Sequence, residues 1–157
     1  MYDIAVVGDG IVGTLLTYEL IQSGKKVLSL GSNQATSSYF SGALINPVAG
    51  KHLKVNTISL ERYQFAVQYY QHLSERFNQE FLVKHDLLFF NRSLIAGAEN
   101  DYVNDDHFQT ENTDIQAVVR VKDVYKVQQQ QLFETVKQYN QAHATYLVAQ
   151  FSIDDLV

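Results

Sequence analysis

Cysteine and tryptophan are absent from this sequence of 157 residues, which also has a single proline and a single methionine. Without cysteine, the chain has no disulfide framework, no thiolate nucleophile and no cysteine-based metal site. Cations are scarce too: 12 Lys and Arg stand against 17 Asp and Glu, giving a net charge of −5. Because nucleic acids and anionic membrane surfaces are bound through clustered cations, this balance argues against both as partners.

Long apolar segments are also lacking. No run approaches the ~20 residues that a membrane span requires, and the N-terminus lacks the charged and apolar regions of a secretory signal. Hydrophobic residues nevertheless make up 46% of the chain, which is enough for a sizeable core. The totals predict an acidic, soluble, cytoplasmic globular protein.

The first 30 residues alternate between strand and helix patterns. Residues 3–8 and 26–30 are apolar without alternation, which is typical of strands buried on both faces. Between them, residues 11–23 have a helical period that stops at Gly24. Strand, helix and strand within about 30 residues predict a right-handed parallel β-α-β unit. The apolar positions of the helix are Ile11, Leu15, Leu16, Leu20 and Ile21.

A glycine-rich turn joins the first strand to this helix. Residues 8–13 read GDGIVG and match the pattern G-x-G-x-x-G. Gly8 permits a tight turn, Gly10 lets the backbone approach a diphosphate, and Gly13 lets the helix lie close to the strand. The N–H groups at the positive end of the helix dipole then bind the diphosphate. The predicted cofactor-binding residues here are Gly8, Gly10, Ile11, Val12 and Gly13.

The acid expected at the end of the second strand is missing. In dinucleotide-binding units an Asp or Glu about 20 residues further on accepts hydrogen bonds from the ribose hydroxyls, and this position is Gly31. Proteins that bind NADP supply an arginine nearby instead. No basic residue occurs from Ser32 until Lys51, which argues against NADP. Ser32 and Asn33 offer weaker hydrogen bonds to a ribose, and we include Gly31 and Ser32 among the candidate cofactor-binding positions.

The remainder of the chain contains one long loop and several regular elements. Residues 31–50 are rich in Gly, Ser, Asn and Ala, and a loop of this length is usually functional. The acidic stretch over 99–114 lacks the periodic ligands and the turn glycine of a calcium loop, and we predict a solvated loop or irregular insertion. Periodicity predicts helices over 57–79 and 128–142 and strands over 83–90, 115–121 and 145–151.

Three segments together resemble the D-amino-acid oxidase and glycine oxidase family of flavoproteins, in particular a bacterial branch. They are the run from Asp3 to Leu30, the loop SGALINPVAG over 41–50, and the long aromatic helix that follows. The segment 124–127 with its following helix resembles that family's return from the substrate domain to the cofactor domain. The resemblance implies FAD as cofactor, with further contacts from Ser41, Gly42, Ala43, Leu44 and Phe151.

The same resemblance implies a domain division and a reaction. We expect an incomplete Rossmann-like FAD-binding domain over 1–56 and 124–157, with part of an α+β substrate domain over 57–123 inserted in it. The implied reaction is hydride transfer from an amine or amino acid to the flavin. Since family members are more than twice as long, we expect an N-terminal fragment that is inactive alone.

Two other functions stay open from the residues themselves: a degenerate or non-catalytic nucleotide-binding module, and an NAD-dependent dehydrogenase. The five histidines show no metal-ligand spacing, so no metal site is predicted. No catalytic residue is assigned.

Overall fold

The structure is a computed structural model with two compact units, Met1–Gly42 with Gln129–Val157, and Ala43–Gln128. The residues that the structure describes are 1–31, 41, 43–48, 57–90, 108–112 and 117–148.

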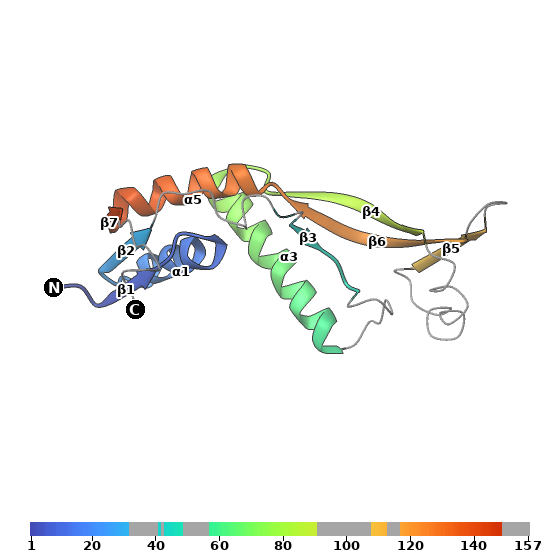
Figure 1. The fold of residues 1–157 in the computed structure, drawn as a ribbon, viewed down its shortest axis with the longest axis horizontal. Helices are drawn as coiled ribbons and strands as arrows, with labels where there is room; N and C mark the ends of the chain where they lie inside the picture. Colours follow the sequence, from blue (N-terminus) through green and yellow to red (C-terminus); the bar gives the residue numbers. More distant parts are fainter. Residues whose placement is uncertain (32–40, 42, 49–56, 91–107, 113–116, 149–157) are drawn as a thin grey trace, which may run out of the picture. The chain divides into compact units, whose positions relative to one another are not determined.

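In its described residues, the first unit contains a three-stranded parallel sheet and two helices (Figure 1). Its strands are β1 (Ile4–Val7), β2 (Val27–Gly31) and β7 (Thr145–Val148), in the order β1-β2-β7. Helix α1 (Ile11–Gln22) connects β1 to β2, and α5 (Gln129–His143) leads into β7. The structure therefore confirms the predicted α/β class and the opening β-α-β unit.

The buried face of α1 differs from the one expected. Its buried residues are Thr14, Thr17 and Tyr18, whereas Leu16, expected on the apolar face, is 47% exposed. Small hydroxyl side chains suit this face because α1 packs closely against α5 as well as against the sheet. The Asn140 side chain of α5 donates a 2.9 Å hydrogen bond to the Thr14 carbonyl, which satisfies a polar pair in the interior.

Helix α5 buries the apolar stripe that its sequence indicates. Leu132, Phe133 and Val136 are buried, at the one-, three- and four-residue spacings of one helix face. Tyr139, one turn after Val136, packs its ring edge to face against Tyr18 of α1, with 5.3 Å between the ring centroids. The two helices thus share an interior on one side of the unit.

The part of the second unit that the structure describes contains a helix and an antiparallel sheet. Its central strand β6 (Ala117–Val127) pairs with β3 (Leu44–Ile45), with β4 (Leu82–Phe90) and with β5 (Phe108–Asn112). Helix α3 (Thr57–Phe77) precedes β4. Figure 1 shows β4 and β6 running side by side as a long ribbon. This α+β unit is inserted in the chain between the two segments of the first unit, as the fold prediction has it.

Several predicted boundaries need correction. Strand β6 extends to Val127, six residues past the predicted end at 121, because it pairs with β4 along nearly its whole length. Strand β5 lies within the stretch predicted as a loop, where pairing with β6 overrides its polar composition. The short β3 likewise lies in the predicted loop over 31–50. Residues 149–151 of the last predicted strand lie outside the described residues.

The boundaries of the two units differ from those of the domains expected from the sequence. Leu44 pairs with Lys126 and Ile45 with Tyr125, and the Val127 N–H donates to the Ala43 carbonyl at 2.9 Å. These bonds tie residues 43–45 and 125–127 into the antiparallel sheet, and both segments fall within the second unit. A cofactor domain over 1–56 and 124–157 stays a prediction.

Gly13 provides a test of how closely α1 packs. A Cβ there would overlap the Gly8 carbonyl oxygen and lie 2.9 Å from the Gly8 carbonyl carbon. We expect Gly13→Ala to lower the free energy of unfolding by about 3 kcal/mol, since a rigid backbone cannot yield. Urea denaturation measures the change. Val12→Ala, at a residue that is 74% exposed, is the control and should stay within about 0.5 kcal/mol of wild type.

Tyr63 provides a test in the second unit. Its hydroxyl donates a 2.6 Å hydrogen bond to the Asp123 carbonyl. Burial, with Tyr125 and Asp123 nearby, raises the pKa of Tyr63 from 10.0 to about 12. The folded state therefore holds a proton that the unfolded state loses above pH 10.0, so stability falls between pH 10.0 and about 12.

We expect Tyr63→Phe to cost about 1 kcal/mol at neutral pH through the lost hydrogen bond, and to flatten the loss of stability at high pH. Urea midpoints at neutral and alkaline pH measure both effects. An equally steep alkaline loss in the variant would assign that loss to other groups.

Candidate functional site

The candidate site lies where β1 ends and α1 begins. In open parallel sheets, ligands bind at the carboxyl ends of the strands. Gly8 follows β1 with φ of 103°, a conformation that side chains disfavour, and its N–H donates to the Leu30 carbonyl of β2 at 2.8 Å. The chain then turns through Gly10, the N-cap of α1. This turn sets the start of α1 directly after the strand.

The first turn of α1 presents backbone donors. Its first intrahelical bond runs from the Thr14 N–H to the Gly10 carbonyl, at 2.9 Å, so the N–H groups of Ile11, Val12 and Gly13 have no partner within the helix. Gly10 forms no side-chain cap, and the first turn has no acidic residue. These donors at the positive end of the helix dipole fit the charge and the spacing of a diphosphate.

Gly31 has no room for a side chain. It is a buried residue at the carboxyl end of β2. A Cβ there would overlap the hydroxyl of Tyr146 and lie 2.7 Å from Oδ2 of Asp9. The acid expected at this position is therefore excluded by space, and another carboxylate lies where its side chain would begin.

The buried Asp9 is the centre of a polar cluster with the half-buried Lys137 and Tyr146. Its Oδ2 accepts hydrogen bonds from Lys137 Nζ at 3.2 Å and from the Tyr146 hydroxyl at 2.9 Å. The Asp9 side chain is 6% exposed and that of Lys137 26%. The cluster joins the glycine-rich turn to α5 and β7 within the first unit.

The electrostatics of this cluster keep Lys137 charged. Burial lowers the pKa of Lys137, but hydrogen bonds with Asp9 and Tyr146 outweigh burial and raise it above its ordinary value. Burial and the bond to Asp9 raise the pKa of the Tyr146 hydroxyl. At neutral pH the cluster thus holds an ammonium, a neutral phenol that donates, and the Asp9 carboxyl group.

Sequence reasoning missed this cluster. Asp9 stands at a variable position of the glycine pattern, and its two partners follow it by 128 and 137 residues. The one signal in the sequence is Asp9 itself, because it is a charged residue in a turn that the glycine motif predicts to be buried.

The other predicted site residues lie in different places. Ser41 accepts a hydrogen bond from the Gln129 side-chain amide at 2.6 Å in the first unit. Ala43, with φ of 41°, and Leu44, on β3, belong to the second unit. The predicted contacts Ser32, Gly42 and Phe151 lie outside the described residues.

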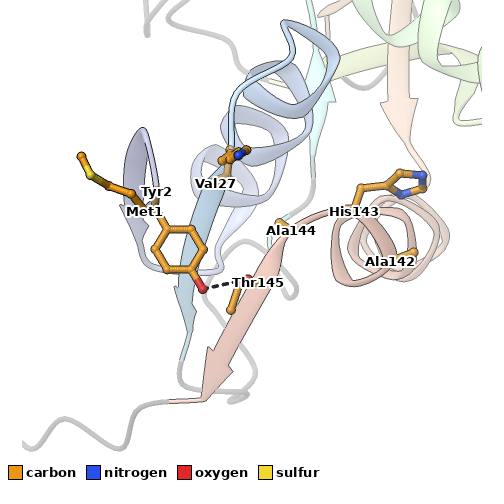
Figure 2. Close-up of a pocket in the computed structure, with 8 residues that line it drawn as sticks. Met1, Tyr2, Val27, Ala142, His143, Ala144 and Thr145 are labelled. Carbon is orange, nitrogen blue, oxygen red and sulfur yellow. Dashed lines mark hydrogen bonds between the residues drawn. The ribbon is translucent and has the colours of Figure 1, made fainter.

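A cavity of about 430 Å³ opens at the opposite edge of the parallel sheet (Figure 2). Its Tyr2 hydroxyl donates to Thr145 Oγ1 at 3.0 Å. Because its lining residues precede or begin the strands, it faces away from the edge where open parallel sheets bind ligands. It is lined by Met1, Tyr2, Lys26, Val27, Ala142, His143, Ala144 and Thr145.

Among the residues that the structure describes, no three His, Asp or Glu side chains gather in a way that could hold a metal ion. None of the described helices is long and apolar enough to cross a membrane.

Comparison with known proteins finds similarity in structure alone. No family model and no curated sequence matches the chain. Glycine oxidase from Geobacillus kaustophilus superposes with a TM-score of 0.69 at 15% identity, over 93% of this chain and 45% of that one. Iminodiacetate oxidase from Chelativorans sp. BNC1 gives 0.65 at 16% identity, over 91% and 46%. The chain has the fold of these oxidases.

L-amino acid deaminase from Proteus vulgaris shares this oxidase fold, with a TM-score of 0.64 at 12% identity, over 93% of this chain and 39% of that one. The chain thus spans less than half the length of each of the three structures. The Rossmann-like fold class predicted from the sequence is confirmed.

The crowding at Gly31 predicts a non-additive pair of substitutions. We expect Gly31→Ala to lower the free energy of unfolding by about 2 kcal/mol, because the new methyl group overlaps the Tyr146 hydroxyl. In a Tyr146→Phe background, which lacks that oxygen, the same substitution should cost less. Urea denaturation of the four proteins measures the coupling. Equal costs in both backgrounds would show that the Tyr146 hydroxyl is not the group that crowds residue 31.

Proposed function

We propose that this chain binds FAD and forms the cofactor-binding part of an oxidoreductase that acts on an amine or amino acid. The observation that carries the proposal is the uncapped first turn of α1 at the carboxyl end of β1, in a fold shared with a glycine oxidase and an iminodiacetate oxidase. A set of backbone donors without partners within the helix is suited to a diphosphate at this place.

The residues present fit the diphosphate of FAD. Gly8 makes the turn, and the Gly10 backbone has no Cβ to keep a phosphate away. The N–H groups of Ile11, Val12 and Gly13 then hold the phosphate oxygens. Electrostatic repulsion from the neighbouring Asp9 is offset because Lys137 lies 3.2 Å from it. The first unit is thus the FAD-binding domain in this proposal.

In the same proposal, the second unit is part of the substrate domain. FAD, when bound, supplies the acceptor for the hydride that leaves the amine carbon. In this proposal, the cofactor contacts are completed by residues of the loop after β2 and by one later residue: Ser32, Ser41, Gly42, Ala43, Leu44 and Phe151. The role of this chain is to bind and orient the cofactor.

The test is flavin binding by the protein expressed from its whole reading frame. We expect it to purify yellow and to release FAD on denaturation. Gly10→Val should abolish flavin binding, because a side chain there occupies the space of the diphosphate. Gly10 has φ of −70° and ψ of −174°, which any residue adopts, so the variant should still fold. Absorbance of the purified protein and calorimetry with added FAD measure the outcome.

Leu16→Ala is the matched control for Gly10→Val, since it truncates an exposed side chain of the same helix at a residue outside the diphosphate-binding turn. A colourless wild-type protein without affinity for FAD would contradict the proposal. Binding of NAD more tightly than FAD would favour a dehydrogenase, and binding of ADP without flavin would favour a non-catalytic nucleotide-binding module.

A further inference from the structure

We propose that Asp9, held by Lys137 and Tyr146, binds the ribose hydroxyls of the nucleotide in place of the acid missing at Gly31. The inference rests on the proposed nucleotide binding and goes beyond it by naming the group that selects the sugar. It predicts a preference for nucleotides whose adenosine ribose carries free hydroxyls.

The first reason is position. A glutamate at residue 31 would hold its carboxylate two bonds beyond Cβ. Oδ2 of Asp9 lies 2.7 Å from the place of that Cβ, so the Asp9 carboxylate occupies the space that such a side chain would fill. Asp9 also belongs to the turn between the diphosphate-binding residues Gly8 and Gly10. The carboxylate therefore arrives at the same edge of the sheet from β1 rather than from β2.

The second reason is the support that the carboxylate receives. A carboxylate whose side chain is only 6% exposed requires compensating partners, and partners of Asp9 include Lys137 of α5 and Tyr146 of β7. Such a buried ion pair adds little net stability compared with apolar side chains of the same size. Partners on two separate elements do, however, fix the orientation of a group that recognises a ligand.

The third reason is charge. Lys137 alone would attract a 2′-phosphate at this edge. Since Asp9 pairs with it at 3.2 Å, the pair is neutral and a phosphate would meet a carboxylate of like charge. Ribose hydroxyls instead donate to a carboxylate. The cluster thus selects unphosphorylated ribose and disfavours its 2′-phosphate, by attraction and repulsion together.

The experiment is calorimetry on the whole protein freed of bound flavin, with ADP, 2′,3′-dideoxy-ADP and ADP carrying a 2′-phosphate. Wild type should bind ADP about tenfold more tightly than dideoxy-ADP, the effect of a hydrogen bond to a charged group. In Asp9→Asn, ADP affinity should fall about tenfold while dideoxy-ADP affinity stays within about twofold. Discrimination against the 2′-phosphate should also weaken.

Asp3→Asn is the matched control. It makes the same chemical change at the other end of β1, where the Asp3 carboxylate accepts the Lys26 N–H at 2.8 Å, and it should leave all three affinities unchanged. A triple variant combines Asp9→Ala, Gly31→Glu and Tyr146→Phe. It moves the carboxylate to residue 31 and removes the hydroxyl that would overlap it. This triple variant should recover the preference for ADP.

The outcomes separate the two proposals. If wild type binds ADP and dideoxy-ADP equally, or if Asp9→Asn keeps the ratio of the two affinities while losing stability, Asp9 has only a structural role. If Asp9→Asn binds ADP more tightly, the carboxylate opposes the nucleotide. Absence of any ADP binding in the folded wild-type protein would overturn the proposed function as well.

Discussion

Helix α1 begins so close to the end of β1 that no side chain fits between Gly13 and the Gly8 carbonyl. This contact sets the first helical turn at the carboxyl edge of the parallel sheet, where its N–H groups have no partner within the helix. It also brings the small residues Thr14 and Thr17 into the interior, where Asn140 of α5 reaches the Thr14 carbonyl. A close backbone contact thus produces both the packing of the first unit and the donors of its candidate site.

A carboxylate in an anion-binding turn is an electrostatic conflict that the tertiary structure resolves. Asp9 lies between the two glycines of the turn, and its charge would weaken the attraction of the helix dipole for a diphosphate. Lys137 and Tyr146 both donate to the same oxygen, so the Asp9–Lys137 pair is neutral and two hydrogen bonds fix the carboxylate. The Asp9 side chain thus occupies the space that an acid at the end of β2 would need. For this reason residue 31 has no room for a side chain and is a glycine.

The two ends of the second unit are hydrogen-bonded to each other. The unit can therefore be inserted in the chain without interrupting the parallel sheet of the first unit. Leu44 pairs with Lys126, and Val127 donates to the Ala43 carbonyl. The chain enters and leaves the unit through neighbouring strands, and α5 begins two residues after Val127. Asp123, with φ of 58°, accepts the Tyr63 hydroxyl and so ties α3 to the central strand.

The sequence by itself determined the β-α-β unit, the glycine turn and the helices α3 and α5, because residues close in the chain encode them. Gly8 and Gly13, and the spacing of Leu132 and Val136, are signals of this local kind. Only the tertiary structure decided the surroundings of Gly31, since the groups that fill it are brought from opposite ends of the chain. Strand β5 was missed for the same reason: its polar residues become a strand through pairing with β6, and pairing depends on a distant partner.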